Sequence, residues 1–284
     1  MARSWSIRIA AAALAALFSA AVGAEARDLH LEGEAIQGGL IFGNAGPGSS
    51  VFLDETEIMV APGGRFVIGF DRDETGERIL RVRYANGHEE SVTLAVAPRE
   101  FAIEHVDGLP PRTVTPDPEA LERIRAEAAL VLAARARRDD RTDYEQGFDW
   151  PAGGRISGVY GSQRILNGEP RRPHYGLDIA APTGSPVHAP ADGVVTLVHP
   201  DMYFSGGTIV LDHGQGLSSS FLHLSRTLVE AGMTVRKGDL IAEIGATGRA
   251  SGPHLDWRMN WLDRRVDPQL LLTGEPPPAG EQDH

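Results

Sequence analysis

Five residues in the second half of the chain are of types that bind metals or transfer protons. His174 and Asp178 are four positions apart, His223 stands alone in an apolar run, and His254 and Asp256 are two positions apart. Imidazole nitrogen and carboxylate oxygen both bind zinc, and a catalytic zinc uses three protein ligands with a fourth position for water. The five residues would therefore suffice for a metal centre with two spare imidazoles for proton transfer.

The local sequence around His174 predicts a turn that leads into a strand. Pro173 precedes the histidine, and Gly176 separates it from Asp178. Both Pro and Gly disfavour a helix here, so the four-residue spacing is not taken as one face of a helix. Asp178 is then expected at the start of a strand.

His254 and Asp256, the last two of the five residues, are predicted to lie on an extended strand. Alternate residues of a strand share a face, so His254 and Asp256 would point to one side while Leu255 and Trp257 point to the core. Any one of the histidines alone is more often structural. Their joint occurrence between Gly and Pro turns is what favours a metal site.

Residues 151–272 are predicted to form a β domain around these side chains. Short apolar runs such as 240–244 alternate with Gly- and Pro-containing turns such as 183–186. Runs bounded by turn residues are typical of strands. Residues 273–284, rich in Gly, Pro, Glu and Gln, are predicted to be a disordered tail.

A series of short motifs follows in a fixed order between 158 and 271. They are Tyr160-Gly161-Ser162-Gln163-Arg164, His174-x-Gly176-x-Asp178, Ala180-Ala181-Pro182-x-Gly184, Asp192-Gly193-Val194-Val195, His223-Leu224-Ser225, Ile244-Gly245-x-Thr247-Gly248 and Gly252-Pro253-His254-Leu255. With them the segment resembles the lysostaphin-type, or LytM-like, zinc metallopeptidases, which hydrolyse peptide bonds in bacterial cell-wall peptidoglycan. The resemblance implies an antiparallel β-sheet core and one Zn²⁺ per chain.

The resemblance also implies roles for individual residues. The first His and the Asp of the His-x-Gly-x-Asp motif are zinc ligands in that family, which implies that His174 and Asp178 bind the metal. Catalytic roles are implied for His223 and His254, which match the histidines that act on the water and the transition state. The family's third ligand is a second His in the closing motif, and this chain has Asp256 there.

The departure at Asp256 leaves two interpretations. A carboxylate is an acceptable zinc ligand, so Asp256 is predicted to be the third one. One His and two carboxylates leave no net charge with Zn²⁺, and such a site would lower the pKa of bound water less than a two-His site. The domain is then either an enzyme with a variant ligand set or a degenerate domain that binds without cutting. The presence of the other four residues together favours the enzyme.

Three functions follow from these interpretations. The first is an exported zinc metalloendopeptidase that hydrolyses peptide cross-links of peptidoglycan. The alternative is a degenerate, non-catalytic LytM-like domain that regulates a cell-wall amidase or binds the wall, and a third is a wall-binding module whose histidines are structural. The expected partners are peptidoglycan stem peptides and, for the alternative, an amidase or another envelope protein.

The N-terminal half is predicted to be a separate β domain. Residues 27–107 contain short apolar runs at hairpin spacing, which predict a small immunoglobulin-like β-sandwich. Asn86-Gly87 is a strong signal for a two-residue hairpin loop. The predicted fold class is thus mainly β, with this sandwich, a connecting α-helix and the C-terminal antiparallel sheet.

The connection, 108–150, is predicted to be a Pro-rich linker followed by a helix. Asp117 can cap the helix, and Pro118 suits its first position. The helix is expected to continue to about Arg138. Its apolar residues share one face at helical spacing: Leu121, Ile124, Ala128, Val131 and Leu132.

Residues 1–26 have the character of a cleaved signal peptide. Two arginines precede an apolar run of about 14 residues and a small-residue cleavage region. The alternative is a membrane anchor, but the run is short for a span. The prediction is an exported chain, in the periplasm or cell envelope, with no membrane span after cleavage.

Composition excludes several other chemistries. The 284 residues include no Cys, which removes disulfides and thiol catalysis. A net charge of -12 argues against nucleic acid as a partner. His213 is expected to be structural, whereas Arg164 and Arg249 are expected either to bind a stem-peptide carboxylate or to form surface ion pairs.

Overall fold

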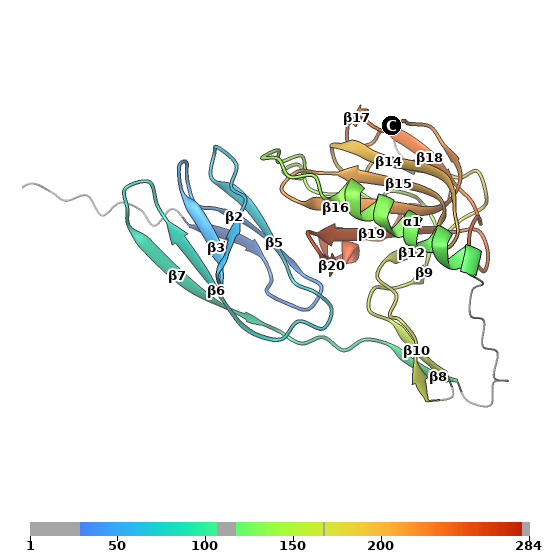
Figure 1. Ribbon diagram of the computed structural model, residues 1–284, viewed down its shortest axis with the longest axis horizontal. Coiled ribbons are helices and arrows are strands. Elements are labelled where there is room, and N and C mark those ends of the chain that lie inside the picture. The colour runs from blue at the N-terminus through green and yellow to red at the C-terminus, as the bar shows by residue number, and fades with distance from the viewer. Residues whose placement is uncertain (1–28, 107–117, 167, 280–284) are drawn as a thin grey trace, which may run out of the picture.

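The computed structural model describes residues 29–106, 118–166 and 168–279, and it is mainly β (Figure 1). The predicted fold class, mainly β, is confirmed, since the described residues form twenty strands, nearly all paired antiparallel, and one α-helix. The predicted signal peptide, Asp117 and most of the Pro-rich linker lie outside the described residues. Within the described ranges, no helix is long and apolar enough to cross a membrane.

Two antiparallel sheets form the N-terminal half. Their buried side chains, including Phe66, Ile68, Val51 and Leu80, are completely inaccessible to solvent. An immunoglobulin-like topology remains a prediction. The sheet orders are β1-β2-β5 and β4-β3-β6-β7, formed by β1 (His30–Gly33), β2 (Leu40–Asn44), β3 (Ser50–Leu53), β4 (Thr56–Ile58), β5 (Arg65–Gly69), β6 (Gly76–Arg83) and β7 (Glu89–Val96).

The hairpin predicted at Asn86-Gly87 joins β6 to β7, but its loop is longer than two residues. The N–H of Tyr84 donates to the His88 carbonyl and the N–H of Gly87 donates to the Tyr84 carbonyl, both at 2.9 Å, so three residues lie between the paired residues Tyr84 and His88. Gly87 has φ of 84°, a left-handed conformation that glycine adopts without steric cost. The Asn86-Gly87 dipeptide therefore predicted the position of the turn correctly, but the predicted loop length of two residues is wrong.

The C-terminal half is organised around a large sheet of order β17-β14-β15-β16-β19-β12-β9. Trp257, Trp261, Phe221 and Ile179 fill its core and are almost completely buried. The strands are β9 (Arg155–Gly158), β12 (Leu177–Ala180), β13 (Pro186–His188), β14 (Gly193–Met202), β15 (Gly206–Asp212), β16 (Leu217–Thr227), β17 (Thr234–Val235), β18 (Leu240–Ile244), β19 (Leu255–Trp261) and β20 (Arg264–Val266), followed by the 3₁₀ helix η1 (Pro268–Leu271). Off this order, β18 pairs with β13 and with β16, and β20 pairs with β19.

Helix α1 (Pro118–Arg135) lies across β14 and β15 (Figure 1). It begins at the predicted Pro118 and ends three residues before the predicted end. Leu121, Ile124 and Val131 are partly buried, but Ala128 and Leu132 are exposed, so their predicted place on the packed face is wrong. The contact follows the narrower row 124, 127, 131 and 134, because a helix lying on a sheet touches it along one stripe only.

Side chains of the 71–74 turn join the N-terminal domain to the C-terminal one. Arg72 donates two hydrogen bonds to the carbonyl of Gly161, at 3.0 and 2.8 Å. Glu74 forms an ion pair with Arg264 at 3.0 Å. Asp71 accepts the backbone N–H of Arg265 at 3.0 Å. The turn therefore fixes the position of β20.

A second connection is a small sheet with β8 (Ile103–Val106), β10 (Gln163–Leu166) and β11 (Glu169–Pro170). Strand β8 belongs to the N-terminal half, and it runs parallel to β10. The tail also differs from its prediction: within 273–279, the carbonyl of Pro277 accepts the N–H of Gly154 at 2.9 Å. Part of the predicted disordered tail thus lies on the β9 edge of the domain.

His213 has a structural environment, as the sequence predicted. It is fully buried, with Nδ1 2.7 Å from the Asp192 carbonyl and Nε2 2.8 Å from Ser219 Oγ. A carbonyl only accepts, so Nδ1 carries a proton. Burial lowers the pKa of His213 to about 4.

This low pKa predicts a loss of stability in acid. Between pH 6.5 and 4 the unfolded state binds a proton at His213 that the folded state does not, so the free energy of unfolding falls as pH falls. From the shift, the decrease is about 3 kcal/mol. Urea unfolding of the parent and of His213→Gln at pH 7 and 4 would measure it. An equal decrease in both proteins would contradict the assignment, since the variant keeps all neighbouring acids.

Candidate active site

Three of the predicted metal ligands meet where β12 lies beside β19. Asp178 and Asp256 are directly opposite each other in this antiparallel pair, so their side chains share a face. His174 lies just before β12, and its Nε2 is 3.1 Å from Asp178 Oδ1. One ligand atom from each of the three residues lies within 4.8 Å of the others.

The backbone of His174 is fixed by a turn at the start of the domain. Its N–H donates to the Ser162 carbonyl and its carbonyl accepts the N–H of Gly161, both at 2.8 Å. The histidine is therefore held on both sides although it lies outside a strand. This explains how a loop residue can take a defined position beside two strand residues.

Two polar atoms in this cluster are buried without a hydrogen bond. His174 Nε2 and Asp178 Oδ1 are both inaccessible and have no bonding partner of acceptable geometry in the described structure. Leaving such atoms unpaired costs about 1–3 kcal/mol each. A cation bound between them would satisfy both, and one imidazole with two carboxylates is a donor set that zinc accepts.

Two glycines provide the space for the carboxylates. A Cβ on Gly158 would lie 2.3 Å from Asp178 Oδ2, and a Cβ on Gly176 would lie 2.3 Å from Asp256 Oδ1. Neither glycine has a positive φ, so the need for glycine at these positions is steric. Gly158 is the residue opposite Asp178 on β9.

Gly176→Ala is therefore expected to weaken zinc binding by roughly tenfold or more, because the added methyl displaces the Asp256 carboxylate. Competition with a chromophoric chelator measures the affinity. Gly63→Ala is the matched control, since a Cβ there meets no atom within 4 Å and its φ is not positive. Unchanged zinc affinity of Gly176→Ala would show that the position of Asp256 does not matter for the metal.

Asp256 is paired with Arg258, a residue that the sequence analysis did not single out. Arg258 Nε donates to Asp256 Oδ1 at 3.0 Å, and its Nη2 donates to Oδ2 at 2.5 Å. Burial alone would raise the pKa of Asp256, but Arg258 and the nearby His174 and His223 hold it below its usual value. Asp256, only 2% exposed, is thus kept ionised with lone pairs left for a metal.

His174 is affected in the opposite sense. Burial alone would lower its pKa, but the nearby carboxylates of Asp178 and Asp256 outweigh burial and raise it. The two carboxylates thus favour a positive charge at His174. A metal ion bound there would take the place of the proton that the carboxylates favour.

The two predicted catalytic histidines lie side by side at the edge of this cluster. The ring centroids of His223 and His254 are 4.8 Å apart, and His254 Nε2 is 3.9 Å from Asp178 Oδ1. His223 Nδ1 lies 2.8 Å from the Thr247 carbonyl, and His254 Nδ1 lies 2.8 Å from the Gly252 carbonyl. Each Nδ1 must donate, so each neutral ring has an unprotonated Nε2.

His223 has a left-handed backbone, with φ of 64°. It lies between Leu222, which pairs with β19, and Leu224, which pairs with β18. The strand thus changes partner at this histidine, and a non-glycine residue there stores about 1–3 kcal/mol of strain. Burial lowers the pKa of His223, and the charges of His254 and Arg258 act in the same direction, so its ring is held neutral.

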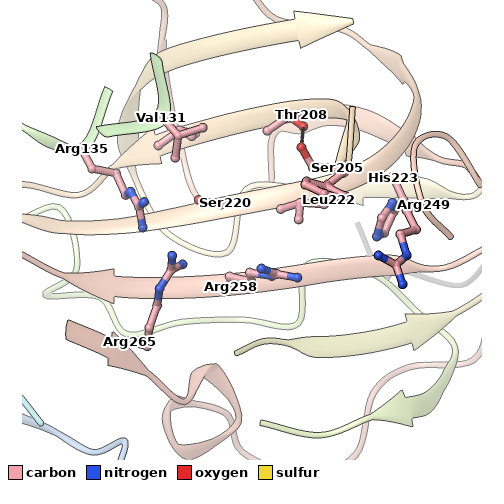
Figure 2. A pocket seen from close by; sticks show the side chains of 12 residues that line it. Val131, Arg135, Ser205, Thr208, Ser220, Leu222, His223, Arg249, Arg258 and Arg265 are labelled. Atoms are coloured by element: carbon pink, nitrogen blue, oxygen red, sulfur yellow. Dashed lines mark hydrogen bonds between the residues drawn. The ribbon is translucent and has the colours of Figure 1, made fainter. Parts of the chain in front are cut away.

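A cavity of about 340 Å³ adjoins His223, and its lining was largely missed by the sequence analysis (Figure 2). Arg135, Arg249, Arg258 and Arg265 line it, together with apolar and hydroxyl side chains. Of these four arginines, Arg249 was expected either to bind a stem-peptide carboxylate or to form a surface ion pair. Arg258 could have been found from the sequence, because it continues the alternation that begins with His254 and Asp256, and Asp256 and Arg258 share one face of β19. Arg164, the other candidate, forms an exposed ion pair with Glu104 at 2.8 Å instead.

Comparison with known proteins agrees with this architecture. Residues 172–268 match peptidase family M23. A Pseudomonas aeruginosa protein assigned to peptidase M23 superposes with a TM-score of 0.65 at 32% identity, covering 84% of this chain and 95% of that one. The chain therefore belongs to peptidase family M23, and the resemblance to lysostaphin-type peptidases is confirmed.

Two curated relatives match the C-terminal domain. An uncharacterized metalloprotease of Haemophilus influenzae is 43% identical over 97 residues, which are 34% of this chain and 20% of the relative. The peptidoglycan DD-endopeptidase ShyB of Vibrio cholerae is 41% identical over 95 residues, which are 34% of this chain and 22% of ShyB. The chain thus spans about a fifth of the length of these relatives.

Proposed function

We propose that this protein is an exported zinc metalloendopeptidase that hydrolyses peptide cross-links of peptidoglycan in the periplasm or cell envelope. The observation that carries the proposal is the convergence of His174, Asp178 and Asp256, with two buried atoms lacking hydrogen bonds, beside two histidines whose Nδ1 atoms are bonded to backbone carbonyls. The name of ShyB supports peptidoglycan as the substrate.

In this proposal His174, Asp178 and Asp256 hold one zinc ion. Zinc bound there supplies a Lewis acid and lowers the pKa of a water molecule. The chain's contribution is to fix three ligands through the 161–162 turn and the β12–β19 register and to keep Asp256 ionised through Arg258. Gly158 and Gly176 keep the space around the carboxylates open.

His254 and His223 have proton-transfer roles in the proposal. With Nδ1 donating to a backbone carbonyl, each ring is oriented so that Nε2 can accept a proton and later return it to the leaving amine. His254 Nε2 faces Asp178 and therefore the ligand cluster. His223, held neutral by its buried position, can accept a hydrogen bond or proton from the water or substrate.

The test is zinc content of the full mature chain by elemental mass spectrometry, followed by digestion of purified peptidoglycan. About one zinc per chain and release of uncross-linked peptides, both absent after chelation, is the expected result. Zinc binding without cleavage would overturn the peptidase proposal in favour of the non-catalytic alternative. No zinc after metal-supplemented purification would overturn it as well.

A further inference from the structure

The cavity beside His223 concentrates positive charge in a chain whose net charge is -12. Its arginines come from four separate places: Arg135 ends α1, Arg249 lies in the loop before His254, Arg258 is in β19 and Arg265 is in β20. In Figure 2 the guanidinium groups of Arg135 and Arg265 point toward each other from opposite sides of the cavity. The fold thus brings like charges together from distant segments.

Most of this charge has no acidic partner. Among the described residues, neither Arg135 nor Arg249 forms a side-chain ion pair, and Arg135 Nε is buried without any hydrogen bond. The polar partner of Arg265 is the neutral side chain of Asn260, at 3.2 Å. Arg258 alone has a carboxylate, and that carboxylate belongs to Asp256.

The electrostatic consequences appear at two of these groups. Burial lowers the pKa of Arg265 to about 10, and the charges of Arg135, Arg258 and Arg172 add to the effect. Burial also lowers the pKa of Arg135, with Arg258 and Arg172 acting in the same direction. Partly buried, unpaired and mutually repelling cations lower stability, so packing does not explain why they are gathered.

We propose that this cavity binds a carboxylate group of the peptide that the enzyme cleaves. Guanidinium groups present planar pairs of N–H donors that match a carboxylate, and several converging groups would hold one firmly. Val131, Leu222 and Phe204 line the same cavity and can contact the aliphatic part of the ligand. His223 and Arg258 connect the cavity to the ligand cluster, so the bound carboxylate lies on one side of the reacting centre.

The inference rests on the proposed function for the identity of the ligand, so its test measures binding without turnover. The probes are an uncross-linked peptidoglycan tetrapeptide with free carboxyl groups and the same peptide with those groups amidated, titrated calorimetrically into the full mature chain. Amidation is expected to weaken binding roughly tenfold or more, because charge-assisted bonds to arginine are lost. Equal affinity of the two peptides would overturn the proposal.

Two arginine variants test whether the peptide carboxylate binds in this cavity. Arg249→Gln, at an exposed residue, and Arg135→Gln are each expected to weaken binding of the free-acid peptide by roughly fivefold to tenfold and to leave binding of the amidated peptide unchanged. Arg164→Gln is the matched control, since Arg164 is exposed and paired with Glu104 on the β8–β10 sheet. If Arg164→Gln also weakened binding of the free-acid peptide, or if neither Arg135→Gln nor Arg249→Gln weakened it, the assignment of the carboxylate to this cavity would be overturned.

Thermal unfolding supplies a readout that a structural role would not give. Arg135→Gln should raise Tm in the absence of ligand, because it removes an unpaired charge from a group of like charges, while it weakens peptide binding. A structural arginine would lower Tm when replaced. Inorganic phosphate that binds more tightly than the free-acid peptide would overturn the assignment to a carboxylate.

Failure of this inference can be distinguished from failure of the proposed function. A chain that binds the free-acid peptide selectively and does not cut cross-linked peptidoglycan retains the carboxylate site and loses the peptidase proposal. A chain that cuts peptidoglycan and binds both peptides equally retains the peptidase proposal and loses the carboxylate site.

Discussion

Replacing Asp256 with alanine is expected to lower bound zinc from about one per chain to near zero and to abolish hydrolysis. The substitution removes one of three ligands and leaves Arg258 partly buried and unpaired beside the remaining two. Loss of the ligand and repulsion between the unpaired Arg258 and Zn²⁺ both weaken zinc binding. Elemental mass spectrometry and peptidoglycan digestion measure the two losses.

Two further variants show whether Asp256 is a ligand or only the counterion of Arg258. Asp263→Ala removes a 91% exposed carboxylate beside β20 and should change neither zinc content nor activity. Arg258→Gln removes the ion pair and keeps the carboxylate, so zinc should be retained. If Arg258→Gln lost zinc and Asp256→Ala kept it, the assignment of Asp256 as a ligand would be wrong.

His254→Ala is expected to retain zinc and to lose activity by roughly 10²–10⁴-fold, the usual contribution of general acid–base catalysis. Its Nε2 faces the ligand cluster at 3.9 Å from Asp178, while its Nδ1 is occupied by the Gly252 carbonyl. Zinc analysis and the initial rate of peptide release separate these effects. His30→Ala, at an exposed N-terminal histidine, is the control. Parent-like activity of His254→Ala would remove this residue from the mechanism.

His223 adds a comparison that depends on its backbone. Both His223→Ala and His223→Gly should lose activity by a similar factor. At φ of 64°, however, alanine retains the strain and glycine relieves it, so the glycine variant should be more stable by about 1 kcal/mol. Urea unfolding measures the difference. Equal stability would indicate that the left-handed conformation does not persist in solution.

The sequence was sufficient for features that depend on local spacing. Pro118 marked the start of α1. Alternation predicted that His254 and Asp256 point to one side, and both lie beside Asp178, although β19 begins one residue after His254. The same local reasoning failed for Leu132, because periodicity shows which residues share a face and not how wide the contact with the sheet is. Local spacing also could not predict that Asp178 lies opposite Asp256, because strand register is set by long-range pairing.

The arginine cavity was beyond local reasoning for the same physical reason. Arg135, Arg249 and Arg265 are separated by long stretches of sequence, and each alone has the character of an ordinary surface residue. The missing carboxylate partners become evident only after the segments are brought together. Gly158 and Gly176 are similar cases, because their need for a hydrogen in place of a side chain depends on carboxylates from other strands.

The junction between the two halves limits how the catalytic segment could be transplanted. The family match begins at residue 172, after β9, which borders Asp178, and after Arg135, which lines the arginine cavity. Asp71 and Glu74 hold β20 from outside the match. A Cβ added to Gly69, which also lies outside the match, would be only 2.9 Å from Trp261 Cβ. A graft of residues 172–268 onto another scaffold would carry all five predicted catalytic and metal-binding residues and would leave behind the parts that fix their surroundings. We therefore expect a transplanted segment to keep its site only if it also includes the 71–74 turn, Arg135 and β9.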